Sequence, residues 1–132
     1  MSRKEEKAVG KKDTKPYQLY QLKSGEGHAV LMFMPYDWLK KNGLKVDPAH
    51  YRKVYQGETS KRTTLDSIFA RFNRPEEMPA DYMARSLSVS DLIVMDGRAW
   101  YVDSFGFRDV TEEVGGLPLD TSGGQLDFFG EG

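Results

Sequence analysis

The dipeptide Asp96-Gly97 separates two short apolar runs, and it constrains the fold more than any other part of the chain. The runs are Leu92–Met95 and Ala99–Val102, and Asp-Gly between such runs favours a type I′ turn, which needs positive φ at both central residues. The sequence therefore predicts a β-hairpin over 91–107. Within it, Gly106 is expected to bend the backbone so that the rings of Phe105 and Phe107 both reach the core.

A second hairpin is expected over 17–34. Residues 17–22 are rich in strand formers and follow Pro16, and residues 24–27, Ser-Gly-Glu-Gly, form a turn signal. Residues 29–34 are apolar without a break, which is typical of a central strand buried on both faces. A further, amphipathic strand is expected over 51–56.

Two short helices are expected over 37–42 and 64–73. Asp37 is the expected N-cap of the first, which ends at Asn42-Gly43. The second carries an apolar stripe at helical spacing, formed by Leu65, Ile68, Phe69 and Phe72. The predicted fold class is therefore α+β: a small antiparallel or mixed β-sheet built from two hairpins (17–34 and 91–107), with two short helices packed on it.

The charge is distributed unevenly along the 132 residues, a length that suits one domain. Residues 1–15 carry a net charge of +3, residues 16–108 carry +2 and residues 109–132 carry −6. We expect a disordered basic N-terminal tail over 1–15, a single folded domain over 16–110, and a disordered acidic Gly-rich tail over 111–132. In that last tail, the cluster at 126–129, Leu-Asp-Phe-Phe, is either a short motif that docks on a partner or part of a loose tail.

The chain has no cysteine, which excludes a disulfide framework, a thiolate nucleophile and a cysteine-based zinc site. No run of apolar residues is long enough to span a bilayer, and the first fifteen residues lack the apolar stretch of a secretory signal. We therefore expect a cytoplasmic protein that does not contact the membrane.

Several short motifs recur in a fixed order, and through them the chain resembles the YodL-like domain over about 17–110. They are Tyr17–Lys23, Pro35–Asp37, Tyr51 with Val54-Tyr55, Leu65–Phe69 with Arg71–Asn73, Ser86–Asp91 and Tyr101–Phe107. Where the resemblance would place Gly-His, before Ser86, this chain has Ala84-Arg85. The resemblance implies a bacterial protein, often carried on conjugative or other mobile genetic elements, whose biochemical activity is largely unassigned.

An enzymatic function would depend on Asp91 and Asp103, which the hairpin places at its open end with Ser88, Ser90 and Ser104 nearby. Asp96 lies at the tip, roughly 13–16 Å away, so the three carboxylates cannot share one ion. The same oxygens can instead bond backbone N–H groups where the chain enters and leaves the hairpin. The two histidines are isolated in sequence, and no phosphate-binding loop or HExxH motif is present. We expect no enzyme, no cofactor and no metal.

Two non-enzymatic functions remain. Aromatic side chains beside a basic run, Lys40, Lys41, Lys45, Arg52 and Lys53, are compatible with nucleic-acid binding. The favoured interpretation is a protein-interaction module, monomeric and encoded by a mobile element, that modulates a host protein or a host defence system. Its candidate binding residues are Ser88, Ser90, Asp91, Asp103 and Ser104, together with the expected surface contacts Tyr36, Trp38 and Arg85.

Overall fold

The computed structural model describes residues 13–122, which form a single antiparallel sheet with short helices. The five strands lie in the order β2-β1-β3-β4-β5, and every neighbouring pair is antiparallel. The fold is thus of the expected α+β class. The strands are β1 Thr14–Leu22, β2 Tyr51–Ser60, β3 Leu92–Met95, β4 Arg98–Val102 and β5 Phe107–Asp109; the helices are α2 Glu26–Ala29, α3 Tyr36–Lys41 and α4 Leu65–Arg71, with 3-10 turns at Pro48–His50 and Pro75–Glu77.

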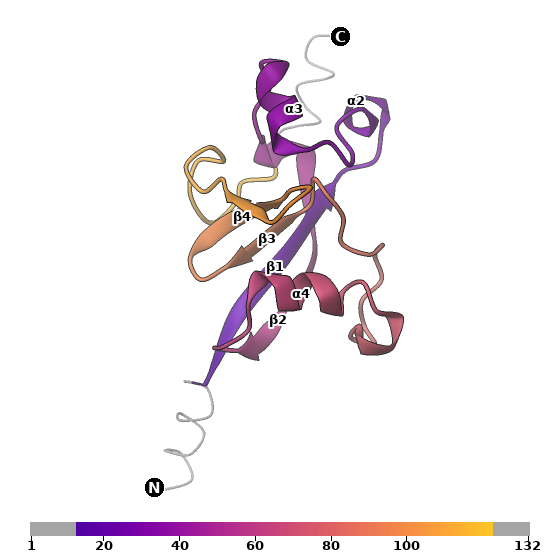
Figure 1. The fold of residues 1–132 in the computed structure, drawn as a ribbon, viewed down its shortest axis with the longest axis vertical. Helices are drawn as coiled ribbons and strands as arrows, with labels where there is room; N and C mark the ends of the chain where they lie inside the picture. The colour runs from indigo at the N-terminus through magenta and orange to yellow at the C-terminus, as the bar shows by residue number, and fades with distance from the viewer. Residues whose placement is uncertain (1–12, 123–132) are drawn as a thin grey trace, which may run out of the picture.

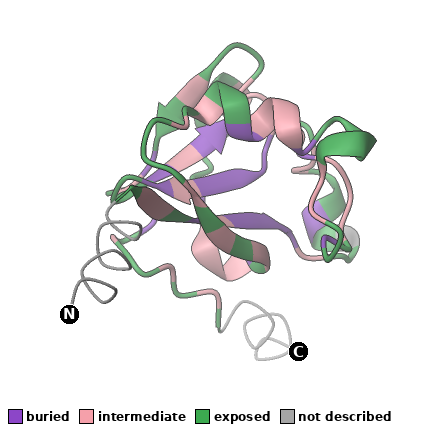
Figure 2. Cartoon of the chain, turned by 90° about the horizontal axis from the view of Figure 1, so that it is seen from below, coloured by how far each residue is buried: buried purple, intermediate pink, exposed green. Residues whose placement is uncertain are grey.

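The sheet, drawn in Figure 1, buries side chains on both faces, which gives two core clusters. Figure 2 colours much of its strands as buried. One cluster includes Leu39 of α3, and the other includes Ile68 and Phe72 at α4. Figure 1 shows α4 lying across β1 and β2, and α2 and α3 gathered at the opposite end of the sheet. Because β1 lies between β2 and β3, it supplies buried residues to both clusters.

The hairpin at Asp96-Gly97 is present, with β3 and β4 paired on either side of it. Asp96 and Gly97 have φ angles of 58° and 72°, as a type I′ turn requires. The expectation for Phe105 was wrong, because its ring is 94% exposed, whereas Phe107 begins β5 and packs against a core cluster.

The expected hairpin over 17–34 does not form. Residues 17–22 belong to β1, but β1 pairs along one edge with β2 and along the other with β3, so no edge is left for a strand at 29–34. That segment instead holds the end of α2 and a turn, and Val30 and Phe33 are each 56% exposed. An apolar run of six residues is compatible with strand or turn, and the competition for β1 decides between them.

Both expected helices are present within two residues of their predicted bounds. The side chain of Thr64 caps α4 by accepting a hydrogen bond from the Ser67 N–H at 3.1 Å. Asp37 was the wrong cap for α3, because it lies inside the first turn. The oxygen that accepts from the Tyr36 N–H belongs to Asp103, 67 residues further along the chain.

The folded part continues past residue 110, where the charge pattern predicts the start of the acidic tail. Val110 and Val114 are buried in the cluster with Leu39. Glu113 accepts hydrogen bonds from the Tyr36 hydroxyl at 2.5 Å and from the Val46 N–H at 2.7 Å. The cluster at 126–129 lies outside the described residues. Over the described residues, no helix combines the length and the apolar character needed to cross a bilayer.

Candidate functional site

Asp91 precedes β3 and its side chain is fully buried. The Arg85 guanidinium donates to both of its oxygens, at 2.9 Å to Oδ1 and 3.2 Å to Oδ2. Oδ2 also accepts from the Ser88 N–H at 2.8 Å and from Gln21 Nε2 at 3.1 Å. The carboxylate is therefore occupied by donors from β1 and from the loop before β3, which is the arrangement of a structural ion pair rather than of an open general base.

The surroundings of Asp91 act on its pKa in opposite directions. Burial raises the pKa of the carboxyl above its usual value, while the hydrogen bonds and charge of Arg85, then the Ser88 N–H and Gln21, oppose that rise. Burial also raises the pKa of the Tyr51 hydroxyl, which donates to the Ser90 carbonyl at 2.6 Å, and raises the pKa of Tyr82 to about 12. These two phenols stay protonated near neutral pH.

Ser90 links this buried pair to the surface. It is buried, has a φ of 90°, and its Oγ accepts a hydrogen bond from the Phe33 N–H at 3.1 Å. Phe33 also lies in the left-handed region, with φ at 65°, and its ring is 56% exposed. The Arg85 guanidinium carbon lies 5.6 Å from the centre of that ring. Ser90 thus fixes the backbone of Phe33, and Arg85 packs against its ring.

Asp103 has a separate set of partners. Its Oδ1 accepts from the Tyr36 N–H at 3.1 Å and the Ser104 N–H at 2.8 Å, and its Oδ2 from Arg108 Nε at 3.4 Å. Among the described residues, Asp91 and Asp103 share no hydrogen-bond partner. Asp103 therefore serves the N-terminus of α3, and the structure does not bring the two carboxylates together as a paired site.

We expect the substitution Asp103→Asn to lower the free energy of unfolding by about 1 kcal/mol, the usual cost of a weakened helix cap. The amide oxygen can still accept from the Tyr36 N–H, but the favourable charge at the start of α3 is lost. Urea denaturation measures the change, with Ser104→Ala as a control, since only its backbone N–H is used. A loss above about 3 kcal/mol would contradict a simple capping role.

The remaining predicted site residues fall into three groups. Tyr36 and Trp38 are partly buried and pack against the core cluster of α3, so they are not the freely exposed contacts that we expected. Arg85 is 32% exposed in its side chain and bridges Asp91 to the Phe33 ring. Ser88 contributes its backbone to Asp91, and Ser104 is exposed.

Sequence reasoning missed Gln21, Phe33 and the pairing of Arg85 with Asp91. Gln21 carried a signal, because an inward-facing amide in a strand needs a buried partner.

The two histidines, expected to be isolated, place their ring centres 5.1 Å apart, with His28 buried. Over residues 13–122 no group of three or more His, Asp or Glu side chains is arranged to hold a metal ion.

Phe33 provides a second prediction, which concerns backbone strain. Glycine adopts positive φ without steric cost, whereas alanine does not. We therefore expect Phe33→Gly to be more stable than Phe33→Ala by about 1 kcal/mol, even though both variants lose the ring. Equal midpoints in urea would mean that the left-handed backbone at residue 33 stores no strain.

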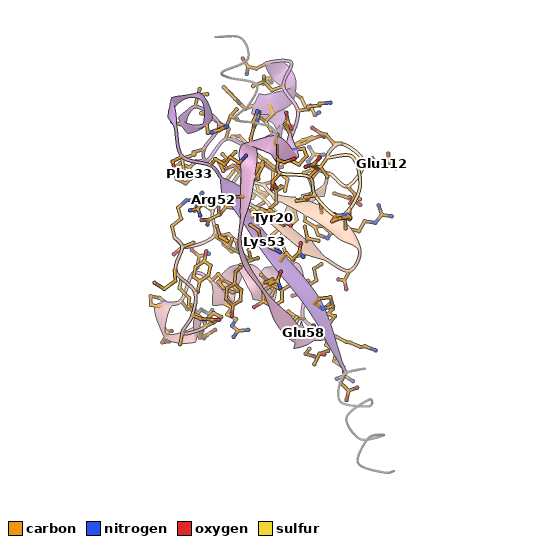
Figure 3. The ribbon with its side chains drawn as sticks, turned by 180° about the vertical axis from the view of Figure 1, so that it is seen from behind. Tyr20, Phe33, Arg52, Lys53, Glu58 and Glu112 are labelled. Carbon is orange, nitrogen blue, oxygen red and sulfur yellow. The ribbon has the colours of Figure 1, made fainter. Side chains whose placement is uncertain are left out.

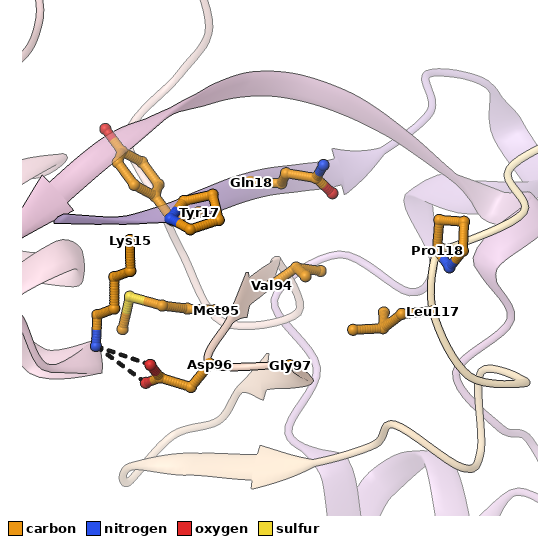
Figure 4. A pocket seen from close by; sticks show the side chains of 10 residues that line it. Lys15, Tyr17, Gln18, Val94, Met95, Asp96, Gly97, Leu117 and Pro118 are labelled. Atoms are coloured by element: carbon orange, nitrogen blue, oxygen red, sulfur yellow. Dashed lines mark hydrogen bonds and ion pairs between the residues drawn. The ribbon is translucent and has the colours of Figure 1, made fainter. Parts of the chain in front are cut away.

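The structure also has an apolar groove of about 400 Å³ at the other end of β1 (Figure 4). Its walls come from β1, the β3–β4 turn and the C-terminal segment, and include Pro16, Tyr17, Val94, Met95, Leu117 and Pro118. Lys15 and Asp96 form an ion pair of 2.9 Å at its rim, drawn dashed in Figure 4. Both oxygens of the Asp96 carboxylate accept hydrogen bonds from Lys15, and most of the other lining residues are apolar.

The comparison with protein families agrees with the pattern of motifs in the sequence. The YodL-like domain matches residues 16–112. The chain belongs to the YodL-like domain family. The match covers all of the sheet except the first two residues of β1, and it covers the helices, the Asp91–Arg85 pair and the Phe33 loop, so these are parts of the YodL-like domain itself. No curated protein and no solved structure matches the chain.

Proposed function

We propose that this YodL-like domain is a non-enzymatic protein-interaction module of a mobile genetic element, which acts in the bacterial cytoplasm on a host protein or defence system. The observation that carries the proposal is Phe33, an aromatic ring that is 56% exposed and held by a left-handed backbone. Strained backbone of this kind persists where the surrounding structure enforces it, often at binding sites.

The Phe33 surface has the composition of an interaction hot spot. Aromatic residues and arginine contribute most to binding at protein interfaces, and here Arg85 lies against the ring of Phe33. Because Ser90 and Asp91 fix both residues before any partner binds, little conformational freedom is lost on association. The carboxylates that would serve catalysis are occupied by structural hydrogen bonds, which further favours binding over chemistry.

The test is affinity capture from a nuclease-treated lysate of a host bacterium, with the full-length chain as bait. The informative variant is Phe33→Gly, which removes the ring and relieves the backbone. The comparison variant is Met83→Ala, which removes another exposed apolar side chain, since Met83 is 89% exposed. We expect a host protein retained by the natural chain and by Met83→Ala, and lost with Phe33→Gly. Equal capture by all three baits, or none, would contradict the proposal.

Nucleic-acid binding is the second candidate, favoured by the position of Arg52. Arg52 is exposed and lies directly opposite Gln21 in the β1–β2 pair, so it shares the sheet face on which Gln21 contacts Arg85. The Arg52 guanidinium can bind a phosphate group, and the exposed Phe33 ring can stack on a base. This candidate predicts binding to single-stranded nucleic acid that weakens steeply with salt and is reduced in Arg52→Ser.

A further inference from the structure

Three basic residues lie near Phe33 at this end of the sheet, and one of them, Arg85, is paired with Asp91. Lys23 follows β1, Arg52 begins the exposed part of β2, and Arg85 lies behind the Phe33 ring. Among the described residues, Lys23 and Arg52 form no ion pair with an acidic side chain. We call Phe33, Arg52 and Arg85 the Phe33 patch. Figure 3 shows Phe33 and Arg52 projecting at the same end of the molecule.

The C-terminal segment arrives at this same end. Lys23 Nζ donates to the Thr121 carbonyl at 2.9 Å, which places Thr121 beside the end of β1. Gln21, whose side chain contacts Arg85 and Asp91, lies only two residues before Lys23. Asp127 is six positions after Thr121, a span of at most about 22 Å when extended. The chain beyond Ser122 is therefore long enough to reach the Phe33 patch.

The chemistry of that remaining segment complements the patch. Residues 123–132 contain two acidic side chains, Asp127 and Glu131, and no basic one. Their apolar side chains are Leu126, Phe128 and Phe129, adjacent to Asp127. A carboxylate next to two aromatic rings can pair with the Arg52 guanidinium and pack against the Phe33 ring.

We propose that residues 126–129 of the same chain dock on the Phe33 patch, with the Asp127 carboxylate against Arg52 and the phenylalanine rings against Phe33. The tail then occupies the surface that a partner would use, so that a partner must displace it. The docking follows from the reach and the complementary chemistry of the tail, whereas its competition with a partner rests on the proposed function.

The absence of cysteine allows a direct test in the full-length chain. Gly130→Cys introduces a single thiol for a nitroxide spin label, and ¹⁵N resonances are compared before and after the label is reduced. We expect the label to broaden the amide signals of Phe33, Arg52 and Arg85, and to spare those of Glu58 and Asp96 at the other end of β1. Signals at the patch that are no broader than those of Glu58 and Asp96 would overturn the proposal.

Three variants of the labelled chain show whether the contact is specific. Arg52→Ser and Asp127→Asn should each reduce the broadening at Phe33, and added salt should reduce it in the natural sequence. Lys53→Ser is the matched control, because Lys53 is the exposed neighbour of Arg52 and points to the opposite face of β2. Broadening that persists in Arg52→Ser, or that is lost equally in Lys53→Ser, would contradict the assigned contact.

A second sample separates docking within one chain from docking between two. In this sample, ¹⁵N-labelled chain without a spin label is mixed with spin-labelled chain that contains no ¹⁵N. We expect no broadening at the Phe33 patch. Broadening in this mixture would assign the tail to a second copy and overturn the proposal. Neither sample contains a partner, so a failed lysate capture leaves this test unaffected, and a failed docking test leaves the lysate capture interpretable.

Discussion

Replacing Arg85 by alanine should lower the free energy of unfolding by about 3–5 kcal/mol at pH 7, because it leaves a buried carboxylate without its counter-ion. Asp91 is fully buried, and Arg85 supplies two of its hydrogen bonds. The Ser88 N–H and Gln21 remain as donors but carry no charge. Urea denaturation of the full-length chain measures the loss.

The loss should depend on pH with a definite sign. Burial already raises the pKa of Asp91 above its usual 3.8, and removing Arg85 raises it further because the guanidinium opposes that rise. A carboxyl with a raised pKa contributes most to stability below its unfolded pKa, and this contribution is lost as pH rises through the folded value. The deficit of Arg85→Ala should therefore be small near pH 4 and grow toward pH 7. An equal deficit at both pH values would contradict this account.

The double variant Arg85→Ala/Asp91→Asn is the control for the buried charge. Asp91→Asn alone should cost less than Arg85→Ala, about 1–2 kcal/mol, since the cation it leaves behind is partly solvated. In the double variant no buried charge remains, so we expect part of the stability lost in Arg85→Ala to return. A strictly additive result would mean that the two side chains do not act as a pair.

A chain ending at Val110 should fail to fold stably, whereas a chain ending at Ser122 should fold. The shorter chain lacks Val114, whose burial is worth about 1.5–3 kcal/mol. It also lacks the hydrogen bonds of Glu113 to Tyr36 and Val46, each worth about 1.5–3 kcal/mol as bonds to a charged group, and its exposed ion pair with Lys40, worth less than about 1 kcal/mol. Their sum is comparable to the whole stability of a small domain. Amide dispersion in ¹H–¹⁵N spectra and thermal unfolding measure the difference.

Glu113 should make the stability of the chain ending at Ser122 depend on pH. Burial raises the pKa of its carboxyl, but the hydrogen bonds from Tyr36, Val46 and Lys40 outweigh burial and leave the pKa below the usual 4.5. Such a group stabilises the fold above its unfolded pKa, and the contribution is lost as pH falls through the lower, folded value. The chain ending at Ser122 should therefore lose stability below about pH 4.5, and Glu113→Gln should weaken that dependence. Equal stability of the two shortened chains would show that residues 111–122 are not part of the fold.

How far the fold could be predicted depends on the range of the interactions involved. The Asp96-Gly97 turn and the apolar stripe of α4 depend on neighbours within a few residues, so their patterns are legible in the sequence. Residues 29–34 were misread because a strand there needs a free edge on β1, and β2 and β3 occupy both edges. The N-cap of α3 was misread for the same kind of reason, since Asp103 comes from a distant loop.

The features of the candidate site also fall into those that the sequence predicts and those that only the structure shows. Composition alone indicates a chain without thiol chemistry and with an acidic C-terminal end, and the ordered motifs indicate the YodL-like family, to which the chain belongs. Only the tertiary structure decides that Asp91 is held by Arg85 and Gln21, and that Phe33 is exposed above them. The physical reason is that the ionisation of a carboxylate and the exposure of a ring depend on burial and on partners distant in sequence, neither of which is encoded in local patterns of residues.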